Sequence, residues 1–173
     1  KLENIFNPNL LKERFENLFI YKDYKKFFID KKRHFRSAIG VGTNKINLSE
    51  IIENINSSNI FFKIDIEGSE YRILDEIIKF QNLISGLVIE FHDIDIHREK
   101  IVDFIKNFKL NVCHIHGQNP GGEDYLDKNK DPIQIEMTFT RSNEIKSNEP
   151  KIPHVLDQPA DKRFRDVKLN FEQ

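Results

Sequence analysis

Residues 60–78 read I-F-F-K-I-D-I-E-G-S-E-Y-R-I-L-D-E-I-I, and this stretch decides the fold. Residues 60–66 are apolar on both faces, which predicts a strand that is buried on both faces of a sheet. Gly68-Ser69 then interrupts the run. Beyond this turn, apolar residues return at helical spacing: Ile73, Leu74, Ile77 and Ile78. A buried strand that leads directly into an amphipathic helix is typical of an α/β fold.

The same alternation of strand and helix continues on both sides of this stretch. Upstream, residues 35–39 predict a short strand, and residues 47–50 have the spacing of a capping box in front of a helix. Downstream, residues 87–91 predict a strand, 97–108 a helix and 110–116 a third strand. Short connections between such elements imply right-handed crossovers, so we expect a mostly parallel sheet with helices on both faces.

The two ends of the chain differ from this middle part. Residues 7–20 predict a helix, with Asn7 as its cap and Pro8 at its first position. Residues 133–140 alternate between apolar and polar, which predicts a half-exposed antiparallel strand at the edge of the sheet, with Glu136 solvated. Such an edge could pair with a second copy, so a homodimer stays open. We expect one domain over 1–173, with a helical region at 1–34 and a polar tail at 141–173.

The composition restricts the partners of the chain. Its 27 basic and 28 acidic residues nearly cancel, which argues against general binding to nucleic acid or to an anionic membrane. No apolar run approaches the ~18 residues of a membrane span, and no signal peptide is recognisable. Cys113 is the single cysteine, which excludes an internal disulfide and fits a reducing compartment. We therefore expect a cytoplasmic protein.

Acidic residues and histidines follow three of the predicted strands. Asp65 and Glu67 follow the first, Glu90 and His92 end the second, and His116 ends the third. Ligands of open parallel sheets bind at the carboxyl ends of the strands, so these five side chains are expected at one lip of the sheet. Such groups suit proton transfer or coordination of a metal that prefers oxygen ligands. Capping of the next helix could explain one or two of these side chains. Five such side chains at three strand ends instead favour a catalytic or metal-binding site.

Several of these segments resemble one known family. The segment 62–71, F-K-I-D-I-E-G-S-E-Y, resembles the K-I-D-[IV]-E-G-[AS]-E signature of FkbM-type methyltransferases. Further similarities are S-A-I-G at 37–40, V-I-E-F-H at 88–92, H-I-H-G-Q-N at 114–119 and I-E-M-T-F at 135–139. The resemblance covers roughly residues 35–171. It implies a Rossmann-like class I methyltransferase sheet, parallel except for a reversed final strand.

The family resemblance also implies a reaction and a set of site residues. The reaction is methyl transfer from S-adenosylmethionine to a hydroxyl of a small molecule or glycan. An alcohol needs a base for this, and the sulfonium supplies the electrophile. The residues it places at the methyl donor are Ser37, Ala38, Asp65, Glu67 and Gly68. The residues it places at the reacting hydroxyl are Asp65, Glu90, His92 and His116, and it assigns no metal ligand.

One element of the family is absent from the sequence. The glycine-rich D-x-G-[AC]-x-x-G loop that holds the donor, and the acid that follows for the ribose, do not occur in residues 1–34. We therefore expect the domain to be incomplete at its N-terminus. Two other functions stay open: a metal-dependent hydrolase that uses Asp65, Glu90, His92 and His116, and a non-catalytic, methyltransferase-like interaction domain.

Overall fold

The computed structural model describes residues 8–28, 34–40, 43–142 and 152–169, with side chains omitted at 8–11, 13–16 and 18. The chain divides into two compact units, Lys1–Ser37 and Ala38–Gln173. In its described residues the first unit contains one long helix, α1 (Pro8–Phe27). It is longer than the predicted 7–20, because the lysine-rich segment that follows is also helical, and lysine is a good helix former.

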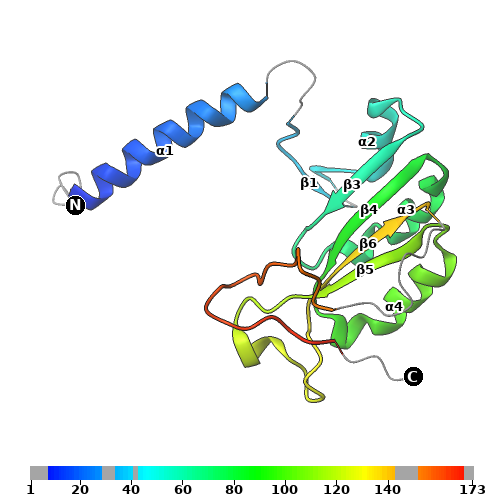
Figure 1. Ribbon diagram of the computed structural model, residues 1–173. Helices are drawn as coiled ribbons and strands as arrows, with labels where there is room; N and C mark the ends of the chain where they lie inside the picture. Colours follow the sequence, from blue (N-terminus) through cyan, green and yellow to red (C-terminus); the bar gives the residue numbers. More distant parts are fainter. Residues whose placement is uncertain (1–7, 29–33, 41–42, 143–151, 170–173) are drawn as a thin grey trace. The chain divides into compact units, whose positions relative to one another are not determined.

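The second unit is an α/β structure with a mixed four-stranded sheet (Figure 1). Its strand order is β3 (Ile60–Ile64), β4 (Ile84–Phe91), β6 (Ile135–Thr140) and β5 (Asn111–Gly117). β3 and β4 are parallel, whereas β6 is antiparallel to both of its neighbours. The three earlier strands therefore share one direction and the final strand is reversed, which confirms the expected α/β class.

Smaller elements surround this sheet. The pair β1 (Ala38–Ile39) and β2 (Lys45–Ile46) is a separate parallel ribbon. The helices are α2 (Leu48–Ile55), α3 (Leu74–Phe80) and α4 (Ile94–Asn107), and short 3₁₀ turns lie at Glu70–Arg72, Gln81–Leu83 and Gly122–Tyr125. Asn47 precedes α2 as predicted. Its side chain makes no capping bond to the backbone and donates instead to Glu50 Oε1 at 3.1 Å.

The predicted edge position of the last strand is wrong. β6 lies between β4 and β5, and its backbone is paired on both sides. Its alternating pattern has another cause: Met137 and Phe139 point into the core, while Glu136 and Thr138 point to a sheet face that is only partly covered. Because both sides of β6 are occupied, a homodimer cannot form through this strand.

One face of the sheet carries the core, and we call it the helix face. Leu87, Ile89 and Phe91 of β4 are fully buried there. Phe104 of α4 packs on Phe91 at 6.3 Å and on Phe139 at 5.7 Å between ring centroids. α3 contacts α4 and α2, so the helices of this unit gather on the helix face (Figure 1). Burial of each large apolar side chain contributes roughly 1.5–3 kcal/mol.

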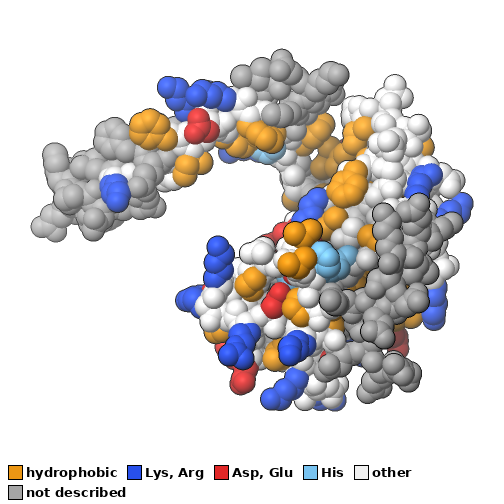
Figure 2. Space-filling view, in the orientation of Figure 1, with side chains coloured by type: hydrophobic (Ala, Val, Ile, Leu, Met, Phe, Trp, Pro, Cys, Tyr) orange, Lys and Arg blue, Asp and Glu red, His pale blue; other side chains and the backbone are white. Residues whose placement is uncertain are grey.

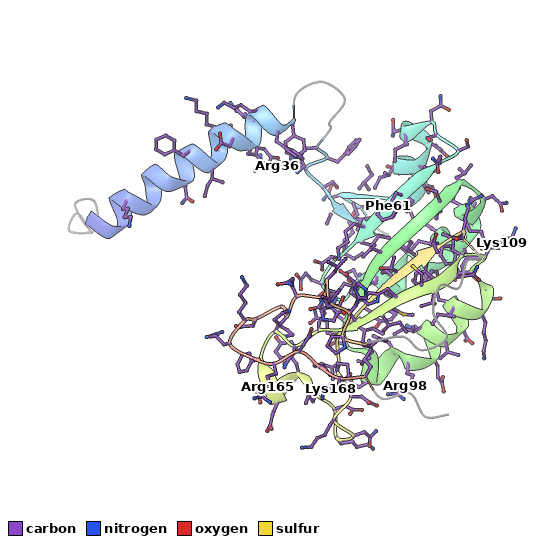
Figure 3. The ribbon with its side chains drawn as sticks, viewed as in Figure 1. Arg36, Phe61, Arg98, Lys109, Arg165 and Lys168 are labelled. Carbon is purple, nitrogen blue, oxygen red and sulfur yellow. The ribbon has the colours of Figure 1, made fainter. Side chains whose placement is uncertain are left out.

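The opposite face, which we call the open face, is covered less. In the described part of the second unit no helix packs on it, so the expectation of helices on both faces is not met there. Phe61 of β3 points to this face and is 63% exposed, which corrects the prediction of a strand buried on both faces (Figure 3). Its ring lies over Gly86 of β4, where an added Cβ would come within 2.7 Å of Phe61 Cδ2.

The C-terminal segment 152–169, which we call the C-terminal strap, has no regular secondary structure. Val167 is buried, and both Val167 and Leu169 lie against Gly117 at the end of β5. A Cβ at Gly117 would come within 3.1 Å of Leu169 and 3.2 Å of Val167. Arg165 and Lys168 mark the strap in Figure 3. The strap therefore packs closely on the carboxyl end of β5.

Candidate functional site

Three of the predicted site residues meet at the carboxyl ends of β3 and β4. Asp65 directly follows β3, Glu90 is the second-last residue of β4, and His92 directly follows β4. One ligand atom of each, a carboxylate oxygen or an imidazole nitrogen, lies within 4.8 Å of the other two. We call these three residues the strand-end cluster. Because side chains alternate along a strand, Glu90 points to the open face while its neighbours Ile89 and Phe91 point into the core.

The turn after β3 adds Glu67 to the site. Its Oε2 lies 3.5 Å from His92 Nε2, and its side chain is 86% exposed. Glu67 has a left-handed backbone (φ 53°) and Gly68 a φ of 89°. Asp93, after β4, is also left-handed, with a φ of 52°. A non-glycine residue in this region costs of order 1 kcal/mol or more, and such strain is found preferentially at functional sites.

The side chain of Glu70 stabilises this turn through hydrogen bonds to its backbone. It is fully buried, and its Oε1 accepts hydrogen bonds from the backbone N–H groups of Ile66 at 3.0 Å and Gly68 at 3.2 Å. The same oxygen lies 3.2 Å from His92 Nδ1. Its second oxygen, Oε2, is buried and has no hydrogen-bond partner among the described residues. Sequence reasoning gave Glu70 no role, since an acid at the start of a helical segment is ordinary.

The contact with Glu70 defines the chemistry of His92. A carboxylate at Nδ1 favours the tautomer with its proton on Nδ1, which leaves a lone pair on Nε2. Nε2 faces carboxylates, with Glu90 Oε1 at 4.0 Å and Glu67 Oε2 at 3.5 Å. His92 therefore presents a basic nitrogen, or a metal ligand, to the centre of the cluster.

Tyr71 fixes the backbone at the same point. Its hydroxyl donates a hydrogen bond of 2.5 Å to the carbonyl oxygen of His92. Burial, together with the nearby charges of Glu70, Asp93 and Asp95, raises the pKa of Tyr71 above its usual value. The phenol therefore remains a protonated donor throughout the neutral range. His92 is thus held both at its ring and at its backbone.

Lys63 and Gln134 flank Glu90. Lys63 Nζ contacts Glu136 Oε2 at 2.5 Å and lies 3.8 Å from Glu90 Oε2. Gln134 Nε2 donates a hydrogen bond to Glu90 Oε1. Glu136, predicted to be a solvated residue of an edge strand, is instead only 27% exposed and ion-paired on a central strand. Hydrophobic, acidic and histidine side chains lie next to one another on the visible face of this unit (Figure 2).

His116 is on the same sheet face but outside the strand-end cluster. It lies opposite Glu136 on β6, which in turn lies opposite Glu90 on β4. Two strand spacings, roughly 10 Å, therefore separate the backbones of His116 and Glu90. His116 is 4% exposed, and its Nε2 lies 2.8 Å from Asp166 of the C-terminal strap. The structure thus brings together Asp65, Glu67, Glu90 and His92, while His116 contacts the strap.

A second histidine–aspartate pair also joins β5 to the C-terminal strap. His114, two residues earlier on β5, lies with Nε2 2.8 Å from Asp157 of the strap. Gln118 Nε2 lies 3.3 Å from His116 Nδ1, and Asn119 Nδ2 donates to the Arg165 carbonyl at 2.9 Å. The histidines of β5 therefore attach the strap to the sheet. Sequence alone did not connect them to aspartates more than forty residues away.

The His116→Ala variant tests this attachment. It removes the contact with Asp166, whose Oδ1 then keeps the Val167 N–H, and takes away the partner of Gln118, so the free energy of unfolding is expected to fall by about 2 kcal/mol. Urea denaturation measures the change. His114→Ala is the matched control and is expected to lose less, since His114 is 29% exposed. If neither variant lowers the free energy of unfolding measurably, the histidines do not hold the strap.

Of the other predicted donor residues, Ser37 and Ala38 are the two residues on either side of the boundary in the chain between the two units. Ala38 begins β1, next to the turn in which the Gly40 N–H donates to the Ile46 carbonyl at 3.1 Å. Ser37 is the last residue of the first unit. Gly68 is part of the turn beside the strand-end cluster. A contact of these residues with S-adenosylmethionine stays a prediction.

Comparisons of the chain with known protein families, curated proteins and solved structures find no match. None of the helices within the described ranges combines the length and the apolar character that crossing a bilayer requires.

Proposed function

We propose that this chain is part of an S-adenosylmethionine-dependent methyltransferase that methylates a hydroxyl oxygen of a small molecule or sugar. The observation that carries the proposal is the strand-end cluster. It lies at the carboxyl ends of two adjacent parallel strands, which is where open α/β sheets bind their ligands. The mixed sheet with a reversed final strand agrees with the fold that the FkbM resemblance implies.

The cluster suits the proton balance of this reaction. The hydroxyl oxygen forms a bond to the methyl carbon while the bond from sulfur to that carbon breaks, and S-adenosylhomocysteine leaves as a neutral thioether. The hydroxyl proton must be accepted nearby, because an alcohol is a poor nucleophile at neutral pH. The carboxylates of Asp65, Glu67 and Glu90 and the imidazole of His92 provide acceptors within one small volume. The exposed position of Asp65 and Glu67 leaves access for a substrate.

The full-length protein provides the test. Calorimetric titration with S-adenosylhomocysteine is expected to give one binding site. Incubation with S-adenosylmethionine and a panel of sugars, phenols and hydroxy acids is expected to give a product heavier by one methylene group in the mass spectrum. Absence of both S-adenosylhomocysteine binding and methyl transfer would refute the proposal.

A metal-dependent hydrolase is the second candidate, favoured by the same three ligand atoms within 4.8 Å. In that case a metal-bound water would be the nucleophile, and the chain would need no methyl donor. Release of product from esters or phosphoesters on addition of Mn²⁺, without any binding of S-adenosylhomocysteine, would favour this second function over the first.

A further inference from the structure

We propose that Asp65, Glu90 and His92 form a binding site for a divalent cation of the Mn²⁺ type, open on one side to a substrate. The inference concerns the cation alone and holds for either of the two reactions above.

The three ligand atoms are close to the spacing that a cation requires. Metal–ligand distances of about 2.0–2.3 Å place neighbouring ligands roughly 3 Å apart and opposite ligands roughly 4.2 Å apart. The ligand atoms of the cluster lie within 4.8 Å of one another, so shifts below about 1 Å close the site. Asp65 makes no hydrogen bond or ion pair within the described part of the chain, so its carboxylate is available to a cation.

The second observation is the buried carboxylate behind the histidine. Glu70 is fully buried, and no lysine or arginine pairs with it among the described residues. A buried carboxylate is costly unless a positive charge compensates it. Among the described residues, the neighbour able to carry such a charge is His92, whose Nδ1 lies 3.2 Å from Glu70 Oε1. A cation on His92 Nε2 polarises the Nδ1–H group toward Glu70, which is the common arrangement of carboxylate, histidine and metal.

The third observation concerns the nearest lysine. Lys63 could neutralise the cluster, but its ammonium group lies at 2.5 Å from Glu136 and only at 3.8 Å from Glu90. Lys63 thus pairs closely with Glu136 and more loosely with Glu90, whose other oxygen accepts a hydrogen bond from Gln134 Nε2. Lys63 therefore neutralises Glu90 in part, whereas Asp65 and Glu67 make no ion pair with a lysine or arginine among the described residues, so a divalent cation would reduce the mutual repulsion of the carboxylates around His92.

The donor set indicates the type of cation and of substrate. Two carboxylates and one imidazole suit Mn²⁺ better than Mg²⁺, which rarely takes nitrogen ligands. Three protein ligands leave open positions, which is typical of a catalytic rather than a structural site. A substrate with two adjacent oxygens, such as a vicinal diol or a hydroxy acid, can occupy two of them. The cation then lowers the pKa of a bound hydroxyl, and this last step rests on the proposed methyl transfer.

Titration of the metal-free full-length protein with Mn²⁺, followed by electron paramagnetic resonance, tests the site. One Mn²⁺ is expected to bind, with nitrogen coupling from an imidazole in the pulsed spectrum. Asp65→Asn, Glu90→Gln and His92→Gln are each expected to weaken binding at least tenfold, and His92→Gln also removes the nitrogen coupling. Zn²⁺ and Mg²⁺ are titrated as competitors, and Mg²⁺ is expected to displace Mn²⁺ poorly.

The matched control is Asp127→Asn. Asp127 lies in the other acidic loop, where its carboxylate accepts the backbone N–H groups of Asn129 at 2.8 Å and Asp131 at 2.9 Å. This control is expected to bind Mn²⁺ like the unmodified protein. The inference is overturned if the protein binds no Mn²⁺, if Asp127→Asn alone abolishes binding, or if the three cluster variants are folded by circular dichroism and bind normally. Binding of S-adenosylhomocysteine without binding of Mn²⁺ would refute the proposed cation site but not the proposed methyl transfer.

Discussion

The Glu70→Ala variant is expected to lose about 3 kcal/mol of the free energy of unfolding. Glu70 is fully buried and accepts hydrogen bonds from the backbone N–H groups of Ile66 and Gly68. Alanine leaves both donors without an acceptor and opens a cavity beneath the turn. Urea denaturation followed by circular dichroism measures the loss.

Glu70→Gln separates the two roles of this side chain. The amide oxygen can still accept the two backbone N–H groups, so the loss of stability is expected to be only about 1 kcal/mol. The negative charge behind His92 is removed, however, and Mn²⁺ affinity is expected to fall about 10–100-fold. If Glu70→Gln lowers the free energy of unfolding as much as Glu70→Ala does, Glu70 does not stabilise the turn through its hydrogen bonds to the backbone.

The His92→Gln variant is expected to lower the rate of the proposed methyl transfer by about 10³-fold. Glutamine is similar in length and remains polar, but it has no basic nitrogen and is a weak ligand for a cation. His92 is only 15% exposed and is held by Glu70 and Tyr71, so its ring has a fixed position that a glutamine side chain does not reproduce. Single-turnover methyl transfer, measured by mass spectrometry, gives the rate.

His114→Gln is the control for this measurement. His114 lies on the same face of the sheet, but its imidazole contacts Asp157 of the C-terminal strap, and glutamine can still donate to that carboxylate. Its rate is expected to stay within about twofold of the unmodified protein. A similar decrease for both histidine variants would assign the effect to the stability of the open face and not to the strand-end cluster.

The α/β class and most elements could be predicted from the sequence because apolar spacing determines them directly. The apolar run that begins at Ile60 and the helical spacing from Ile73 to Ile78 correspond to β3 and α3. The position of β6 could not be predicted in this way. An alternating strand has the same pattern at a sheet edge and at the centre of a sheet with one partly covered face. Only pairing between strands distant in the chain distinguishes the two.

The candidate site was predictable for a related reason. Strand ends are local features, so the proximity of Asp65, Glu90 and His92 follows from two neighbouring parallel strands. The environment of His116 depends on the C-terminal strap, whose path no local pattern specifies. The role of Glu70 could not be predicted, because the sequence shows only an acidic residue near the start of a helix. Its role follows from its complete burial beneath the turn, which is a property of the tertiary structure.

The central position of the last strand has a consequence for biosynthesis. β4 and β5 make no direct pairing with each other. β4 also pairs with β3, whereas β5 pairs with β6, which is translated after a connection of 17 residues (118–134) following β5. A nascent chain that has reached only Gly117 would therefore hold β5 without any hydrogen-bonded neighbour among the described strands. Sheet closure then has to wait for the ribosome to release Ile135–Thr140. Until that point the nascent chain exposes β5 as an unpaired strand, a period in which chaperones are commonly required.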